Sequence, residues 1–158
     1  MPKVEYLSHD VVKEKGWDVR DERIFERADG MELSEEEHGV MEVPEGDDIL
    51  GVAETEGRDW SVKCRKGRCG RCTSIVVEGE VSMEDQEFLT DDEKEDGYCL
   101  PCVSTPETDV KLVYGAKSSD RVSDRVLATY DDEAGCWRLT GEKWFCSNID
   151  AEGTLALA

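Results

Sequence analysis

The chain has 158 residues and a formal net charge of −20, from 39 acidic and 19 basic side chains. This balance argues against nucleic acid as a partner, because phosphate binding requires a basic surface. No apolar run approaches the roughly 18 residues of a membrane span, and no signal peptide opens the chain, which predicts a soluble cytoplasmic protein.

The first half of the chain predicts two strands and three short helices. Residues 3–7 alternate between apolar and polar side chains, as a half-buried strand does. Further along, acidic side chains at the start of an apolar helical pattern suit the helix dipole. We expect strands at 3–7 and 39–43, and helices near 9–16, 20–28 and 47–56.

The second half predicts a loop followed by further strands. Residues 58–71 are rich in Gly and Arg and predict the loop, whereas Thr90-Asp-Asp-Glu is an N-capping pattern for a brief helix. We expect strands at 72–78, 98–103 and 109–114, and a last short helix at 118–127. Strands mixed with helices in one small sheet indicate the α+β class.

The chain has seven cysteines, an odd number that cannot all pair in disulfides. In a reducing compartment, clustered cysteines favour a metal site. Three of them read C-x4-C-x2-C and a fourth follows after 29 residues, which is the plant-type iron–sulfur spacing. Gly67 and Gly70 suit such a loop, because glycine adopts positive φ and brings backbone N–H groups near the sulfur atoms. The candidate ligands are Cys64, Cys69, Cys72 and Cys102.

Other interpretations of these cysteines stay open. Cys69/Cys72 and Cys99/Cys102 form two C-x2-C pairs, which also occur in structural zinc sites. Cys99-Leu-Pro-Cys102 could form a redox disulfide, and Cys99 could replace Cys102 as the fourth ligand. We prefer an iron–sulfur cluster that uses Cys102.

Several segments resemble plant-type [2Fe–2S] ferredoxins, and most closely the ferredoxins of halophilic archaea. The resemblance covers about residues 1–127 and includes the four-cysteine motif. The other matching segments are Met-Pro-Lys-Val-Glu-Tyr-Leu at the start, Met41-Glu-Val-Pro-Glu-Gly, Ile49-Leu50, Ala53-Glu54, Ile75-Val-Val-Glu-Gly-Glu-Val, and Cys102-Val with Asp109-Val-Lys-Leu-Val-Tyr.

The resemblance implies a β-grasp fold with residues 9–38 as an acidic helical insertion after the first strand. It implies one [2Fe–2S] cluster on the four cysteines and one-electron transfer, with partners such as 2-oxoacid:ferredoxin oxidoreductases or ferredoxin reductases. We expect a monomeric carrier rather than an enzyme, since no nucleophile–base pair stands out. His9 and His38 lie away from the cysteines in sequence and are expected to be structural or surface residues.

The acidity has two interpretations. It is either an ordinary solvated surface or a surface adapted to very high salt, where screening makes the repulsion between acidic groups less costly. The resemblance to halophilic ferredoxins favours the second interpretation.

The predicted cluster loop departs from the family in its charge. Residues 63–71 carry five positive side chains and no acidic one: Lys63, Arg65, Lys66, Arg68 and Arg71. Cations near a cluster favour its more negative, reduced state and should raise the reduction potential, unless they only solvate the loop or pair with acids. A second hypothesis is that the basic rim docks an acidic patch of the partner. Pro101 also precedes the fourth cysteine, so one local N–H donor is expected to be missing.

The last 30 residues differ in character, and we divide the chain into a ferredoxin domain at 1–128 and an extension at 129–158. The extension is expected to be disordered or to form a hairpin centred on Gly141, with Leu139 opposite Lys143. Its Leu-Thr-Gly-Glu-Lys-Trp-Phe-Cys-Ser-Asn segment resembles part of the middle β-domain of acyl-CoA dehydrogenases. Beside a free carrier, two functions stay open: an electron-input subunit of a larger oxidoreductase, and a four-cysteine zinc-stabilised interaction module.

Overall fold

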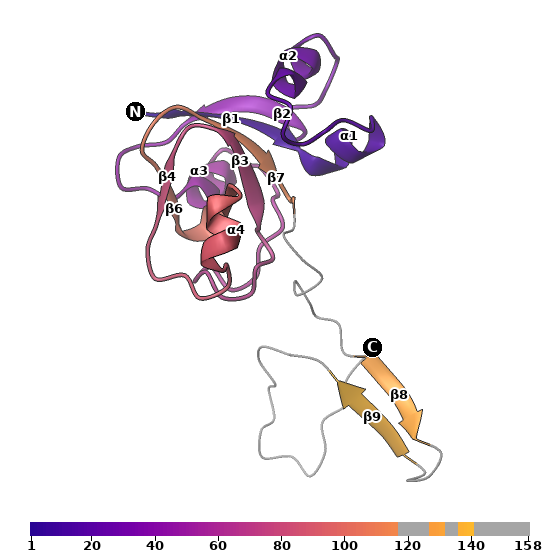
Figure 1. Cartoon of the computed structure of the whole chain (residues 1–158). Helices are drawn as coiled ribbons and strands as arrows, with labels where there is room; N and C mark the ends of the chain where they lie inside the picture. The colour runs from indigo at the N-terminus through magenta and orange to yellow at the C-terminus, as the bar shows by residue number, and fades with distance from the viewer. Residues whose placement is uncertain (117–126, 132–135, 141–158) are drawn as a thin grey trace. The chain divides into compact units, whose positions relative to one another are not determined.

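The computed structural model describes residues 1–116, 127–131 and 136–140. It divides into two compact units, Met1–Ser118 and Ser119–Ala158 (Figure 1). No helix of the described residues is long and apolar enough to cross a membrane.

The first unit is built on a five-stranded sheet with the strand order β2-β1-β7-β3-β5. Strand β1 pairs in parallel with β7 and antiparallel with β2, and β3 is antiparallel to β7 and β5. A second, two-stranded sheet joins β4 to β6. The strands are β1 (Lys3–Ser8), β2 (His38–Glu42), β3 (Ser74–Glu78), β4 (Val81–Met83), β5 (Tyr98–Cys99), β6 (Ser104–Pro106) and β7 (Val110–Tyr114). This mixed sheet with few helices confirms the predicted α+β class and β-grasp fold.

Two hydrophobic cores lie on the two faces of the sheet, because alternate side chains of a strand point to opposite faces. From β1, Val4 and Tyr6 enter the core that also contains Ile49 and Leu50 of helix α3 (Ile49–Thr55). Leu7 points to the other face and packs with residues of α1 (His9–Glu14) and α2 (Arg23–Asp29). The helices predicted near 9–16, 20–28 and 47–56 are therefore confirmed as α1, α2 and α3 (Figure 1).

Local signals set the ends of the helices. The Asp48 side chain caps α3 by accepting a hydrogen bond from the Gly51 N–H at 2.7 Å. Thr90 and Glu93 form a reciprocal capping box at the start of α4 (Asp91–Glu95), as the sequence predicted.

The structure corrects the prediction of one strand at 98–103. Strand β5 ends at Cys99, and a 3₁₀-helix, η1 (Pro101–Val103), separates it from β6. Proline has no N–H to donate to a ladder and its φ is restricted, so the strand cannot continue through Pro101. The predicted strand at 72–78 begins only at Ser74, because the Thr73 N–H and hydroxyl both bond to the Gly70 carbonyl and form a turn there.

In the second unit, the described residues form a hairpin of β8 (Leu127–Asp131) and β9 (Cys136–Thr140). Leu139 pairs with Ala128 of β8. The hairpin predicted around Gly141, with Leu139 opposite Lys143, falls on residues that the structure does not describe and stays a prediction. Lys143 and the rest of 141–158 lie outside the described residues, as does the helix predicted at 118–127 apart from Leu127, which begins β8.

Candidate metal centre

Two segments bring the four predicted ligands together. Cys64, Cys69 and Cys72 lie on the loop between α3 and β3, and Cys102 lies on η1. Cys72 and Cys102 are buried, with 7% and 8% of their surface exposed, whereas Cys64 and Cys69 are partly exposed. A group bound here would therefore lie between the buried core and the surface of the first unit.

The path of the loop requires glycine at two positions. Gly67 and Gly70 both have φ of +67°, in the left-handed region. A Cβ atom on Gly67 would lie 2.8 Å from the Gln86 Cβ, and one on Gly70 would lie 2.3 Å from the Phe88 ring. The Gly67 carbonyl also accepts hydrogen bonds from the N–H groups of Glu87 and Phe88, at 2.9 and 3.2 Å. The loop is thus held closely against the 86–88 segment.

Backbone N–H groups point at the sulfur atoms of the loop. The N–H groups of Lys66, Arg68 and Cys69 each donate to the Cys64 Sγ at 3.4 Å. The Arg71 N–H donates to the Cys69 Sγ at 3.5 Å. Although burial raises the pKa of the Cys64 thiol, these donors stabilise its thiolate and lower the pKa to about 7. The thiolate is the form that binds metals.

The four sulfur atoms form two close pairs. The Cys64 and Cys69 side chains are hydrogen-bonded, and so are those of Cys72 and Cys102. The hydrogen bond to Cys102 and burial both raise the pKa of Cys72, and the same hydrogen bond lowers that of Cys102. In the part of the chain that the structure describes, no three of these sulfur atoms all lie within 4.8 Å of one another.

Two pairs fit two metal ions better than one. Four thiolates around a single zinc ion, at about 2.3 Å each, would lie only about 3.8 Å apart in a tetrahedron. A binuclear cluster instead needs two ligands for each iron, with a wider separation between the pairs. The pairing therefore favours an iron–sulfur cluster over a four-cysteine zinc site.

Cys99 lies in the hydrophobic core and not at this site. Its side chain is fully buried, and burial raises the pKa of its thiol to about 12. Cys102, three residues later, is the one whose sulfur meets Cys72. Pro101 occupies the first position of η1, where a missing N–H costs no hydrogen bond within the turn.

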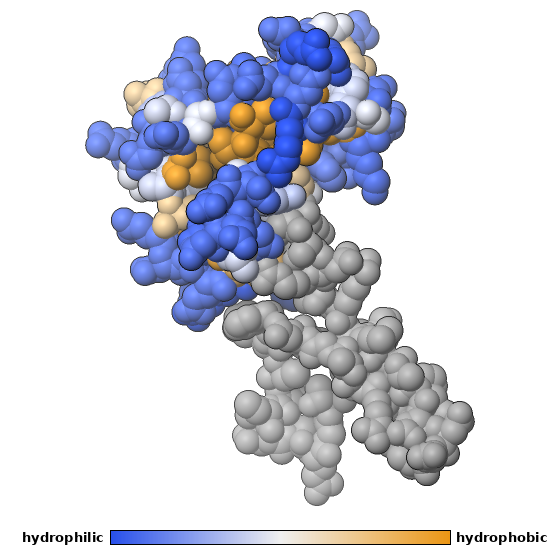
Figure 2. Space-filling model, in the orientation of Figure 1, coloured by the Kyte–Doolittle hydropathy of each residue, from blue (hydrophilic) through white to orange (hydrophobic). Residues whose placement is uncertain are grey.

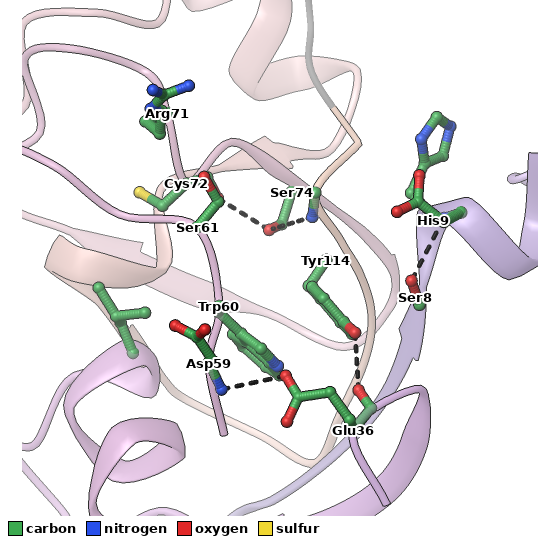
Figure 3. Close-up of a pocket in the computed structure, with 13 residues that line it drawn as sticks. Ser8, His9, Glu36, Asp59, Trp60, Ser61, Arg71, Cys72, Ser74 and Tyr114 are labelled. Carbon is green, nitrogen blue, oxygen red and sulfur yellow. Dashed lines mark hydrogen bonds between the residues drawn. The ribbon is translucent and has the colours of Figure 1, made fainter. Parts of the chain in front are cut away.

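Three aromatic side chains, Tyr6, Trp60 and Tyr114, pack together in the core that also contains Cys72 of the ligand loop. Trp60 stacks on Tyr114, with their rings 4.4 Å apart and tilted by 9°, and Tyr6 contacts Trp60 edge-on. Trp60 and Tyr114 also line a cavity of about 350 Å³ together with Cys72 and Arg71 (Figure 3). Trp60 and Cys72 also belong to the same hydrophobic core, so the loop joins the core of the first unit at Cys72.

Arg65 and Arg68 of the loop are paired with acids. The Arg65 guanidinium bonds to both carboxylate oxygens of Glu54, one of them at 2.6 Å. Arg68 lies 3.4 Å from Glu87. Sequence reasoning did not identify these acidic partners, because each is more than ten positions away and only the folded chain brings it to the loop. The positive charge that acts on the site is therefore smaller than the sequence suggested.

Comparison with known proteins agrees with this geometry. Residues 33–107 match the 2Fe-2S iron-sulfur cluster binding domain. The chain is 45% identical over 129 residues to Ferredoxin-1 of Haloarcula marismortui, and the alignment covers 80% of this chain and all of that ferredoxin. The chain belongs to the [2Fe–2S] ferredoxin family. The chain is also 34% identical over 125 residues to Ferredoxin-2 of Haloarcula marismortui, and this alignment covers 78% of the chain and 91% of the relative. A heterocyst ferredoxin of Nostoc is 39% identical over 73 residues, covering 46% of this chain and 74% of the relative.

The family establishes the cofactor and the activity. This ferredoxin uses a [2Fe–2S] cluster and carries one electron at a time. The relatives from a halophilic archaeon support the interpretation of its acidic surface as an adaptation to high salt.

Proposed function

We propose that Cys64, Cys69, Cys72 and Cys102 bind the single [2Fe–2S] cluster of this ferredoxin. The observation that carries the assignment is the arrangement of the sulfur atoms as two hydrogen-bonded pairs, one pair for each iron. The cluster supplies the redox chemistry. The chain supplies four thiolates, and the N–H groups at Cys64 and Cys69 offset part of their negative charge.

With this site, the ferredoxin shuttles electrons between other proteins and transforms no substrate itself. Suitable partners are 2-oxoacid:ferredoxin oxidoreductases and ferredoxin reductases, and the place of action is the cytoplasm. We take the working form to be a monomer. Partial exposure of Cys64 and Cys69 supports this role, because it leaves the loop side of the cluster within reach of a docked partner.

A second candidate is an electron-input subunit of a larger oxidoreductase. The observation that favours it is the extra chain: Ferredoxin-1 is matched over its full length by only 80% of this sequence. Residues 129–158 would then form the docking element, apart from a ferredoxin domain at 1–128. Co-purification with a large subunit that is lost when 129–158 are deleted would favour this candidate over a free carrier.

Anaerobic purification with metal analysis and EPR of the reduced protein tests the proposal. We expect two irons for each chain and the signal of a one-electron-reduced [2Fe–2S] cluster. The same measurement on residues 1–128 should give the same signal if the cluster belongs to that domain alone. Stoichiometric zinc in a colourless protein would refute the proposal.

A further inference from the structure

Three side chains that the cluster does not use lie together beside the insertion. Glu5 comes from β1, Asp29 is the last residue of α2, and His38 begins β2. The His38 Nε2 lies 3.3 Å from the Glu5 Oε1 and 3.8 Å from the Asp29 Oδ1. One ligand atom of each residue lies within 4.8 Å of the other two. Figure 1 shows α2 next to the β1–β2 pair that supplies the other two residues.

The fold sets this arrangement from the backbone. In the antiparallel β1–β2 pair, Leu7 is opposite His38 and Glu5 is opposite Val40. Glu5 and His38 are therefore diagonal neighbours on the same face of the sheet, a separation that long side chains bridge. The His38 N–H donates to the Ser34 carbonyl at 3.0 Å, which further holds the start of β2.

The distances suit a small divalent cation. Zinc binds imidazole nitrogen and carboxylate oxygen at about 2.0–2.2 Å, so neighbouring ligand atoms of a tetrahedral site lie about 3.3 Å apart. The His38–Glu5 separation has this value, whereas the Asp29 carboxylate lies 3.8 Å from the His38 Nε2 and within 4.8 Å of Glu5, so it must move inward to complete the site. Its side chain is 68% exposed at the end of a helix, which leaves it free to make that movement.

Among the described residues, Lys111 interacts electrostatically with Glu5 and offsets only part of the negative charge of this group. Lys111 lies opposite Glu5 on β7, but its Nζ pairs with the Glu78 carboxylate at 2.8 Å. Glu22 adds further negative charge near Lys111. The His38 and Glu5 side chains are only 12% and 22% exposed, so an ion between them would be partly shielded from water.

We propose that Glu5, Asp29 and His38 form a second metal site, which takes a divalent cation of the zinc type with water as the fourth ligand. An imidazole with two carboxylates is a donor set for zinc and related transition ions rather than for magnesium or calcium. The ion would join the end of α2 to β1 and β2 and reduce the repulsion between acidic groups of the insertion. The site shares no residue with the cluster.

The test is calorimetric titration of Zn²⁺ into the cluster-loaded ferredoxin, with the visible absorption of the cluster recorded to show that it stays intact. We expect one Zn²⁺ site in the wild type. Loss of a group that merely orients a metal ligand already lowers metal affinity about 10–100-fold, so losing the ligand in His38→Ala should weaken binding by about tenfold or more. His9→Ala is the matched control, because it removes the other histidine of the chain and should bind as the wild type does.

A second pair of variants tests the site independently, in case His38→Ala fails to fold. Asp29→Asn changes an exposed side chain and should abolish the site, whereas Glu26→Gln makes the same charge change elsewhere on α2 and should keep it. Co²⁺ bound at the site should give the absorption bands of a tetrahedral ion in the wild type, in His9→Ala and in Glu26→Gln, but not in His38→Ala or Asp29→Asn. The proposal is overturned if the wild type binds no Zn²⁺, or if His38→Ala and Asp29→Asn bind it as tightly as their controls.

Discussion

At the scale of single residues, the proposed cluster site depends on the backbone conformation of its loop as much as on the four cysteines. Gly67 permits the left-handed turn that aims the N–H groups of the loop at Cys64, and its own N–H donates to Cys102. The motif spacing and the need for glycine were both readable from the sequence. The ion pairs of Arg65 and Arg68 were not, because their partners come from other elements.

Gly67→Ala should weaken the site. Its new Cβ would lie 2.8 Å from the Gln86 Cβ and 3.0 Å from the Gln86 Cα, and backbone atoms cannot move aside cheaply. Gly16→Ala is the matched control, since Gly16 has a φ of +65° with no atom within 4 Å of the added Cβ. The control should lose only about 1–2 kcal/mol of folding free energy for the left-handed conformation.

Chemical denaturation followed by cluster absorption would measure both glycine variants. We expect Gly67→Ala to lose more stability than Gly16→Ala and to release its cluster at lower denaturant concentration. Equal losses in the two variants would show that close packing against Gln86 does not matter.

The charge of Arg68 should act on the reduction potential. Removing a cation near the cluster disfavours the more negative, reduced state, so Arg68→Gln should lower the midpoint potential. Glu87→Gln should raise it, because that variant removes the acid that pairs with Arg68. One charge pair at 4 Å in water is worth about 1 kcal/mol, which corresponds to about 40 mV or less for one electron.

Redox titration at low ionic strength would measure these shifts, with Arg27→Gln on α2 as a control of equal charge change. A midpoint potential that is unchanged in Arg68→Gln and in Glu87→Gln, or that shifts equally in Arg27→Gln, would contradict a local role of the charges beside the cluster.

At the scale of elements, periodicity predicted what lies inside one segment and missed what depends on contacts between segments. The helices α1, α2 and α3 and the strands β1, β2 and β7 follow from apolar spacing and capping signals. Strand β4 has only three residues and exists through its pairing with β6, so its own pattern was too short to detect. Pro101 gave a local signal that the 98–103 segment breaks, but its cysteine and apolar neighbours resembled a strand.

The insertion should be held to the sheet mainly by its apolar face. Phe25 of α2 is 1% exposed and shares a core with Leu7 and Val113. Phe25→Ala should cost about 3–5 kcal/mol of folding free energy, the usual result of truncating a buried aromatic side chain. Glu26→Ala, on the exposed side of the same helix, should cost little.

Urea unfolding would give both values, and EPR of the reduced variants would report on the cluster. We expect a normal cluster signal in Phe25→Ala under native conditions, because α2 contributes no ligand. Equal stability of the two variants would show that α2 is not anchored through this core.

At the scale of the whole molecule, charge dominates the surface. Figure 2 shows that the visible face of the described chain is mostly hydrophilic, broken by one hydrophobic band. With a net charge of −20, acidic groups repel one another in the folded state. The ion pairs at Asp21, Glu54 and Glu78 relieve only part of this repulsion.

Stability should therefore rise with salt. The Debye length falls from about 10 Å at 0.1 M to about 3 Å at 1 M, which screens repulsion between exposed acids. Thermal unfolding in KCl should show a midpoint that increases steeply over this range, whereas sorbitol of equal osmolarity should raise it less. A midpoint independent of KCl would contradict the high-salt interpretation.

We assign Cys102, and not Cys99, as the fourth ligand of the cluster. The most direct measurement is EPR and iron analysis of Cys102→Ser beside Cys99→Ala, both purified anaerobically. We expect Cys99→Ala to keep two irons and the wild-type signal at reduced stability, and Cys102→Ser to lose the cluster or show an altered signal. A normal, stable centre in Cys102→Ser, or its loss in Cys99→Ala alone, would contradict the account.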